Sequence, residues 1–288
     1  MADIAVVGLG TMGSNLALNI DGKGYTVALH NRTKQKIYGT LEKSCSGRMI
    51  PCDNLDECIR CLRKPKKIIL MVTDTAVDLF LGDFKQLLEA GDILIDGGNS
   101  YWRETERRQK EFEEIGVHFV GMGISGGEEG ALNGPSIMFG GSREAWNHCS
   151  EILTAISAKA TDGSPCVDWI CLKATVHFVK MIHNAIEYAD LQVIAEVYDI
   201  MKSIMNLTNE EIADSFHQWN LSENKSFLIE TAEKVIRRKE GGVYLIDLIK
   251  DSAEQKGTGK WAAKDSFDIG YPVTAFTEAV EARFMSAL

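Results

Sequence analysis

The chain has 288 residues, of which 45% are hydrophobic and 25% are charged, and its formal net charge at pH 7 is −10. This composition is typical of a globular protein with one large or two ordinary domains. The acidic balance argues against nucleic acid as a partner, although it permits a locally basic pocket for an anionic small molecule. No apolar run approaches the roughly 18–20 residues that span a membrane. We therefore expect neither nucleic acid nor a membrane among the partners.

The seven cysteines are an odd number and lack the spacing of a disulfide framework. The N-terminus has no basic region of the kind that begins a signal peptide, so we expect a reducing, cytoplasmic location. Cys58 and Cys61 form a C-x-x-C pair, with Cys45 and Cys52 upstream. A zinc site is possible, but no second pair or nearby histidine completes a four-ligand set. We expect two thiols on one helix face and no metal.

The first part of the chain alternates apolar strands with helices. Near-continuous apolar strands in this rhythm predict a parallel sheet covered by helices on both sides. We expect strands at residues 3–10, 25–31, 66–72, 91–98 and 117–125, and helices at 11–24 and 102–115.

From about residue 172 this rhythm stops, and no strong strand signal follows. Apolar residues then recur at helical spacing, which predicts an all-α second domain. We expect helices at residues 174–205, 209–219, 224–237, 243–254 and 274–287. The predicted domains are therefore residues 1–173 and 174–288.

Gly8, Gly10 and Gly13 form a G-x-G-x-x-G pattern between the first strand and the first helix. Glycines there permit a tight turn and the close approach of a pyrophosphate to a helix N-terminus, whose free N–H groups and dipole favour an anion. The pattern predicts a dinucleotide site in a doubly wound, Rossmann-type domain. A glycine-rich turn without a ligand is the alternative.

The end of the second strand indicates which dinucleotide binds. Enzymes that use NAD place an acidic residue there to hold the ribose hydroxyls, but this strand ends in Asn31, and Arg32 follows. A cation favours a 2′-phosphate, so we expect NADP. The alternative is that Arg32 is an ordinary surface arginine.

Two glycine-rich segments, IDGGNS and GMGISGGEEGA, follow apolar strands. In an open parallel sheet, ligands bind beyond the carboxyl ends of the strands. We expect Asn99, Ser125, Gly126 and Gly127 to point there, although such loops are more often simple turns. A third segment, residues 253–263, carries lysines around two glycines and suits an anion, although such a loop is usually only solvated.

The segment KMIHNAIEY places Lys180, His183, Asn184, Glu187 and Tyr188 on one face of a helix. The opposite face is apolar, and apolar residues flank the segment on both sides. So mixed a polar row on a largely buried helix predicts a ligand site. A buried polar network with a structural role is the alternative.

Seven segments occur in order: GLGTMGSNL, NRT, IDGGNS, SGGEEGA, GPSIM, HFVKMIHN with IEY, and QKGTGKW. Together they resemble the 6-phosphogluconate dehydrogenase family, from residue 3 to the last residue. The resemblance implies oxidative decarboxylation of 6-phosphogluconate to ribulose 5-phosphate, in the pentose phosphate pathway, by a homodimer that uses NADP.

By this resemblance Lys180 is the general base and later the acid, and Glu187 is the second acid. The hydroxyl of a 3-hydroxy acid must lose its proton as hydride leaves carbon 3, and a neutral lysine can accept that proton. Burial favours the neutral form of a lysine. The β-keto acid then loses carbon dioxide without a metal when its carbonyl is hydrogen-bonded, and Glu187 supplies a proton to carbon 1 of the enediol.

The resemblance also implies two sets of binding residues. The coenzyme set is Gly8, Gly10, Thr11, Met12, Gly13, Asn31, Arg32, Thr33, Val72 and Asn99. The substrate set is Asn99, Ser125, Gly126, Gly127, His183, Asn184, Glu187, Tyr188, Lys256, Thr258 and Arg283. Within the second set, Tyr188, Lys256, Thr258 and Arg283 match the family's phosphate contacts.

Several positions depart from the family pattern. Cys171, Ala174 and Val176 replace glycines before the polar helix, and we expect their Cβ atoms to crowd the nicotinamide. Ala185 and Ala189 also replace glycines and should fill space beside the ligand. The loop VTDTAVD is one residue shorter than in relatives and contains Asp74, which we expect to disfavour a phosphate-bearing coenzyme.

The family's long members continue beyond the position of Leu288. We therefore expect a shortened helical domain, weaker substrate binding, and an exposed helical face that needs a partner. Two other functions remain open. One is a β-hydroxyacid dehydrogenase for another small 3-hydroxy acid, and the other is a catalytically impaired dinucleotide-binding protein.

Overall fold

The computed structural model describes residues 1–44, 46–173 and 175–288. The expectations for Cys45 and Ala174 lie outside the described residues. The chain forms two compact units, Met1–Lys180 and Met181–Leu288.

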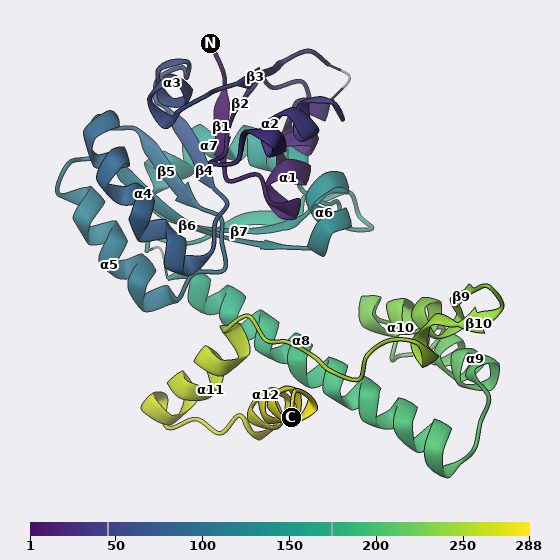
Figure 1. Cartoon of the computed structure of the whole chain (residues 1–288). Coiled ribbons are helices and arrows are strands. Elements are labelled where there is room, and N and C mark those ends of the chain that lie inside the picture. The colour runs from purple at the N-terminus through teal and green to yellow at the C-terminus, as the bar shows by residue number, and fades with distance from the viewer. Residues whose placement is uncertain (45, 174) are drawn as a thin grey trace. The chain divides into compact units, whose positions relative to one another are not determined.

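The first unit is built on an eight-stranded sheet with the order β3-β2-β1-β4-β5-β6-β7-β8 (Figure 1). Its first six strands run parallel, and the order 3-2-1-4-5-6 is that of the Rossmann fold. The sequence order reverses between β1 and β4, which is where such sheets bind dinucleotides. The strands are β1 Ile4–Val7, β2 Val27–His30, β3 Met49–Pro51, β4 Lys67–Leu70, β5 Ile93–Asp96, β6 His118–Ser125, β7 Ser136–Gly140 and β8 Val167–Cys171.

The last two strands differ from the predicted all-parallel sheet. β7 pairs antiparallel with β6, with Ser125 opposite Ser136 and Gly121 opposite Gly140, and β8 runs parallel to β7. The connection between β6 and β7 holds only the short helix α6, Gly127–Asn133. A parallel crossover needs about a dozen residues or more, so the chain returns in the opposite direction.

Helices cover both faces of this sheet, as predicted. Side chains alternate between the faces along each strand, so that Val6 joins one buried cluster and Val7 the other. One face packs against α1 Thr11–Gly22, α2 Lys34–Leu41 and α7 Arg143–Ile156. The other face packs against α3 Leu55–Arg60, α4 Asp74–Leu87 and α5 Trp102–Glu113.

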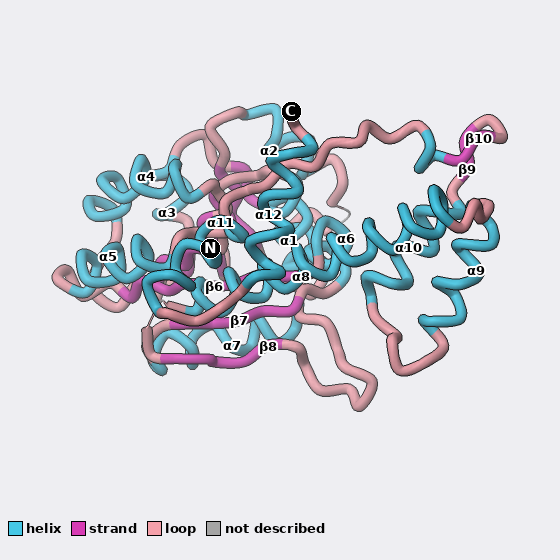
Figure 2. Tube along the Cα trace, turned by 90° about the horizontal axis from the view of Figure 1, so that it is seen from below, coloured by secondary structure: helices cyan, strands magenta, loops and turns pink. Residues whose placement is uncertain are grey.

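Helices dominate the second unit, as Figure 2 shows by colour. Helix α8 begins in the first unit and continues into the second as far as Asp199. Ile212, Phe216 and Ile236 form part of a buried cluster in this unit. The elements are α8 Val176–Asp199, a π-helical turn Ile200–Ile204, α9 Asn209–Asn220, α10 Phe227–Arg237, β9 Lys239–Glu240, β10 Val243–Tyr244, a 3₁₀ turn Leu245–Asp247, α11 Thr258–Ile269 and α12 Thr274–Ser286.

The predicted helix at 243–254 is wrong. Gly241 and Gly242 both adopt positive φ, +59° and +85°, and join β9 to β10 as a two-residue hairpin turn. The sequence signal for this turn was the Gly-Gly pair followed by β-branched and aromatic residues.

Helix α11 was missed, because its first residues were read as a loop. Gly257 precedes the helix with φ +101°. Gly259 lies in its first turn, where glycine is a poor helix former. A Cβ atom at Gly259 would lie 2.7 Å from the Tyr188 ring, so close packing against that ring explains the glycine.

Candidate active site

The turn between β1 and α1 gives each of its three glycines a different surrounding. A Cβ atom at Gly8, where φ is +97°, would lie 2.5 Å from the Met71 carbonyl oxygen. A Cβ at Gly13 would lie 2.0 Å from the Gly8 carbonyl oxygen, so this glycine lets α1 pack on the strand. Gly10 has no atom within 4 Å of its Cβ position and leaves open space at the helix N-terminus. This geometry fits a pyrophosphate.

Thr11 and Met12 are the first two residues of α1, whose first turn carries no acidic side chain. The N-terminus of a helix bears a partial positive charge from its free N–H groups. An anion at this turn would therefore meet backbone N–H donors with no acidic side chain beside them.

Asn31 fastens the end of β2 to the glycine turn. Its Oδ1 accepts a hydrogen bond from the Leu9 N–H at 2.8 Å, and its Nδ2 donates to the Thr33 carbonyl at 2.9 Å. The amide group thus holds both the glycine turn and the residue that precedes α2. An aspartate could not make the second contact, because a carboxylate has no donor.

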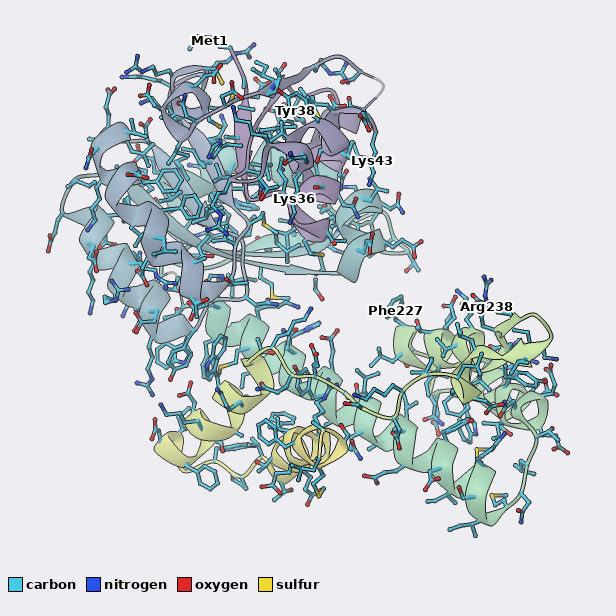
Figure 3. All side chains as sticks on the ribbon, viewed as in Figure 1. Met1, Lys36, Tyr38, Lys43, Phe227 and Arg238 are labelled. Atoms are coloured by element: carbon cyan, nitrogen blue, oxygen red, sulfur yellow. The ribbon has the colours of Figure 1, made fainter. Side chains whose placement is uncertain are left out.

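Arg32 projects from the same segment into solvent. Its side chain forms no hydrogen bond or ion pair with the residues that the structure describes. It precedes α2, from which the exposed side chains of Lys36 and Tyr38 project (Figure 3). The guanidinium is therefore available to an anionic ligand.

The loops that follow β4 and β5 touch each other. A Cβ atom at Gly98 would lie 2.4 Å from the Val72 carbonyl oxygen. Asp96 shapes the second loop, because its carboxylate accepts hydrogen bonds from Ser100 Oγ at 2.7 Å and from the Gly98 N–H at 3.1 Å. Asn99 lies in this loop and is exposed. The two predicted coenzyme residues Val72 and Asn99 thus belong to adjacent loops.

Asp74 does not present a free charge to the coenzyme loop. Its carboxylate binds Nη1 of Arg108 at 2.9 Å, and Arg108 is 1% exposed. The same guanidinium binds Asp78 at 2.8 Å and lies 3.7 Å from buried Asp96. The expectation that Asp74 would disfavour a phosphate was made without this buried arginine, with which the carboxylate is paired.

Ser125, Gly126 and Gly127 lie where β6 ends and α6 begins. Gly126 precedes α6 with φ +127°, and Gly127 is the first helical residue. No atom lies within 4 Å of a Cβ position at Gly127. The segment predicted as a loop is therefore a strand-to-helix turn with open space beside its backbone.

Lys180 is buried, with 5% of its surface exposed. It lies in the second turn of α8, and its Cβ would lie 3.0 Å from a Cβ atom at Gly123. One turn earlier, His177 is 1% exposed, and its Nδ1 lies 2.8 Å from Thr105 Oγ1 on α5. Burial lowers the pKa of the His177 imidazole. No sequence pattern marks His177, which anchors this turn.

Cys171 and Val176, which replace glycines of the family pattern, are both accommodated within the first unit. Val176 is fully buried and packs against Gly140, where a Cβ atom would lie 2.6 Å from its own Cβ. The Sγ of Cys171 lies 2.9 Å from the Lys173 carbonyl oxygen. The side chain of Val176 therefore points into the packed interior rather than into open space. In the second unit, Ala185 is also fully buried.

Four predicted substrate residues follow Lys180 on α8. Nδ1 of His183 lies 3.6 Å from Oε2 of Glu187, and Asn184 is 8% exposed. Both side chains of the His183–Glu187 pair are partly exposed, at 38% and 41%. The imidazole of His183 and the carboxyl group of Glu187 are both groups that can exchange a proton with a bound molecule.

Of the four residues predicted to hold a phosphate, Lys256 and Arg283 contact Tyr188. Its hydroxyl oxygen accepts the Lys256 N–H at 3.3 Å, and the Arg283 guanidinium lies 3.9 Å above its ring. Arg283 also donates to the Glu254 carbonyl at 2.7 Å. Thr258 begins α11 and is buried. Tyr188, the backbone of Lys256 and the Arg283 guanidinium, which are distant in sequence, therefore lie together within the second unit.

The C-x-x-C pair does not share one helix. Cys58 is buried in α3, and Cys61 follows the end of that helix. Burial raises the pKa of the Cys61 thiol to about 11. Among the described residues, no three His, Cys, Asp or Glu side chains are placed to hold a metal ion. No helix in the described part of the chain is long and apolar enough to cross a membrane.

A doubly wound sheet with a glycine turn at its switch point, followed by a helical unit, defines a two-domain protein of the dinucleotide-binding class. The family described as the NAD binding domain of 6-phosphogluconate dehydrogenase matches residues 3–171. The family described as the 6-phosphogluconate dehydrogenase C-terminal domain matches residues 176–288. The chain belongs to the 6-phosphogluconate dehydrogenase family.

Individual relatives support the same family assignment. The decarboxylating 6-phosphogluconate dehydrogenase of Escherichia coli K12 is 46% identical over 291 aligned positions, which cover 99% of this chain and 61% of the relative. The enzyme of Klebsiella pneumoniae is 45% identical with the same coverage. The chain thus spans about three fifths of the length of these relatives.

Solved structures show the same fold. The 6-phosphogluconate dehydrogenase of Plasmodium falciparum, described in apo form and with NADP+ or 6-phosphogluconate, superposes with a TM-score of 0.92 at 39% identity. That match covers 99% of this chain and 62% of the other. A 3-hydroxyisobutyrate dehydrogenase of Salmonella typhimurium has a TM-score of 0.76 at 15% identity, which shows the fold alone.

Proposed function

We propose that this chain catalyses the NADP-dependent oxidative decarboxylation of 6-phosphogluconate to ribulose 5-phosphate, a reaction of the pentose phosphate pathway, as a cytoplasmic homodimer. Residues 1–173 hold the coenzyme, and residues 174–288 hold the substrate and the partner. The observation that carries the proposal is the cluster around Tyr188, in which the Arg283 guanidinium lies over the ring and the backbone N–H of Lys256 donates to the hydroxyl, on the helical unit that also carries His183, Asn184 and Glu187 of α8. An unphosphorylated 3-hydroxy acid would leave that cluster without a use.

NADP fits the first unit. Gly10 leaves room for the pyrophosphate at the N-terminus of α1, with Gly8, Thr11, Met12 and Gly13 around it. The 2′-phosphate binds Arg32, which Asn31 and Thr33 flank, because a charge-assisted contact favours it over a bare hydroxyl. Val72 and Asn99 contribute from the loops after β4 and β5. When bound, NADP+ accepts a hydride from carbon 3 of the substrate.

Lys180 and Glu187 move the protons. Nζ of neutral Lys180 takes the proton of the carbon 3 hydroxyl as the hydride leaves, which turns carbon 3 into a carbonyl carbon. The ammonium then donates a hydrogen bond to that carbonyl oxygen. The bond between carbons 1 and 2 breaks and carbon dioxide leaves, while the electron pair of that bond forms the double bond of the enediol and Lys180 gives its proton to the former carbonyl oxygen. Glu187 then gives a proton to carbon 1 of the product as Lys180 takes back the hydroxyl proton, and ribulose 5-phosphate results.

The remaining residues orient the sugar acid. Asn99, Ser125, Gly126 and Gly127 follow strands of the first unit, and His183 and Asn184 lie on α8. Amide, hydroxyl and backbone donors of this kind suit a carboxylate and a row of hydroxyl groups. Positioning of this kind accounts for a large part of an enzyme's rate.

The test is NADPH formation with 6-phosphogluconate, compared with gluconate and 3-hydroxyisobutyrate. Only the phosphorylated acid should react. Lys180→Met should abolish oxidation and leave coenzyme affinity within about twofold, because the lysine acts on the substrate hydroxyl. NADPH formation from 3-hydroxyisobutyrate alone would show that the chain is a different dehydrogenase. A parallel loss of coenzyme affinity in the variant would show that Lys180 serves the coenzyme or the fold instead.

A further inference from the structure

We propose that Gly123 is a positioning residue that fixes Cβ of Lys180 against the sheet. Gly123 and Gly140 together form a glycine seat, which means a pair of positions without side chains against which the first turns of α8 pack. The importance of this seat for catalysis rests on the proposed role of Lys180. The seat itself is defined by contacts within Met1–Lys180.

The register of β6 and β7 places the glycines on one face of the sheet. Val120, Met122 and Ile124 of β6 join the buried cluster on the face that α1 and α7 cover. Because side chains alternate along a strand, Gly121 and Gly123 belong to the opposite face. Gly140 pairs with Gly121, and Met138 pairs with Gly123. Three of these four positions on the second face therefore lack a side chain.

Two residues of α8 occupy the space that these glycines leave. Val176 and Lys180 are four residues apart and so lie on the same side of the helix. A Cβ atom at Gly140 would lie 2.6 Å from Cβ of Val176, and one at Gly123 would lie 3.0 Å from Cβ of Lys180. The start of α8 therefore contacts two neighbouring strands through consecutive turns. A larger residue in place of Gly123 or Gly140 would lift the helix away from the sheet.

Gly123 is required for space rather than for backbone conformation. It is not among the glycines with positive φ, so alanine can adopt its backbone angles. An alanine methyl at this position would also lie 3.4 Å from Cγ of Lys180 and 3.3 Å from Sδ of Met138. Such distances require the neighbours to move by a few tenths of an ångström. Cβ of Lys180 would be displaced, and the atoms from Cγ to Nζ would move with it.

The seat matters because Lys180 is buried. With 5% of its surface exposed, the side chain has little space in which to correct a displaced Cβ by changing its rotamer. A proton acceptor must lie within hydrogen-bond distance of the reacting hydroxyl. Even small errors in such positioning reduce the rate strongly.

The test compares Gly123→Ala with Gly82→Ala. Gly82 lies in α4 with nothing within 4 Å of its Cβ position, so it controls for adding a methyl group to the first unit. Gly123→Ala should lower kcat at least about tenfold, while KM and the dissociation constant for NADP+ change less than about twofold. Gly82→Ala should match the wild type in all three. A Gly123→Ala variant that keeps its kcat, or that loses coenzyme affinity equally, contradicts the proposal.

Crystal structures of the wild type and Gly123→Ala give a readout that does not depend on activity. Cβ of Lys180 should move away from β6 in the variant, and an unmoved lysine would overturn the seat. If the wild type fails to oxidise 6-phosphogluconate, the proposed function fails, but this displacement still decides the seat. If Gly123→Ala does not fold, Gly123→Ala with Met138→Ala relieves the sulfur contact and keeps the contact to Lys180. The double variant should show the same displacement relative to Met138→Ala alone.

Discussion

We propose that coenzyme choice rests on one exposed side chain, that of Arg32. Arg32 is free of partners among the described residues, whereas its neighbour Lys34 is ion-paired with Asp53 at 2.8 Å. Asn31 holds the segment in place through both ends of its amide group. The site therefore offers one uncommitted cation at the end of β2, where enzymes that use NAD carry an acid.

Arg32→Ala should erase most of the preference for NADP over NAD. We expect the wild type to favour NADP by at least about tenfold, or about 1.4 kcal/mol, because the arginine–phosphate contact is charge-assisted. Dissociation constants from coenzyme fluorescence measure both ligands. Lys34→Ala is the matched control and should keep the preference, since Asp53 already neutralises that lysine. Equal binding of NAD and NADP by the wild type would refute the role of Arg32.

Many residues of the candidate site could be predicted from the sequence because they belong to short local patterns. The glycine turn needs three glycines at fixed spacing, and the polar row of α8 repeats at helical spacing. His177 and Arg108 lack such a pattern. Their importance comes from burial against Thr105, Asp74 and Asp96, which lie far away in sequence. Only the packed structure identifies them.

Among the elements, α5 is joined to α4 and to the end of β5 through Arg108. This guanidinium reaches Asp74 and Asp78 on α4 and lies near Asp96 at the end of β5. Arg107, one residue earlier, binds Asp78 at 2.7 Å and Glu104 at 2.8 Å, but its side chain is 44% exposed. Adjacent arginines with similar partners thus differ mainly in burial.

Arg108→Met should destabilise the protein by about 3–5 kcal/mol, because it leaves carboxylates without their buried cation. Arg107→Met should change the free energy of unfolding by less than about 1 kcal/mol, as surface ion pairs usually do. Urea unfolding of both variants measures the difference. Equal effects for the two arginines would show that burial of Arg108 does not decide its contribution.

Asp78 should make stability depend on pH in the acid range. The hydrogen bond from Arg108 lowers the pKa of Asp78 from 3.8 to about 2. A carboxylate with a depressed pKa stabilises the fold above its unfolded pKa and loses this contribution as the pH falls through the folded value. Between about pH 4 and pH 2, Asp78→Asn should therefore lose less stability than the wild type, as judged by urea midpoints. An identical decline in both proteins would contradict the shift.

Two elements were predicted wrongly, α11 and the segment 243–254. In both, local propensity and the observed packing favour different structures. Two glycines and two lysines made residues 253–263 look like a loop, yet α11 begins at Thr258, and the ring of Tyr188 fills the space beside Gly259. The apolar residues after Gly242 looked helical, yet the Gly-Gly turn commits them to a hairpin and a 3₁₀ turn. In both places a tertiary or turn requirement overrode average preferences.

At the scale of the whole molecule, the chain consists of two units with unequal cores. Met1–Lys180 buries apolar side chains on both faces of its sheet. In Met181–Leu288 a smaller cluster joins α9 and α10, around Phe216 and Ile212. Hydrophobic stabilisation grows with the apolar area removed from water. The second unit should therefore be the less stable of the two.

This difference predicts two steps in calorimetric unfolding, with the helical unit melting first. NADP+ should raise only the later transition, because the proposed coenzyme residues on α1, β2 and their turns belong to the first unit. At a hundredfold excess over its dissociation constant, a ligand adds about 2.7 kcal/mol to the unit that binds it. NAD+ at the same concentration serves as the control and should shift that transition less, and Arg32→Ala should make the two coenzymes alike. A single transition that moves as a whole would show that the two units unfold together. A shift confined to the earlier transition would place the coenzyme on the helical unit and overturn the assignment of the glycine turn.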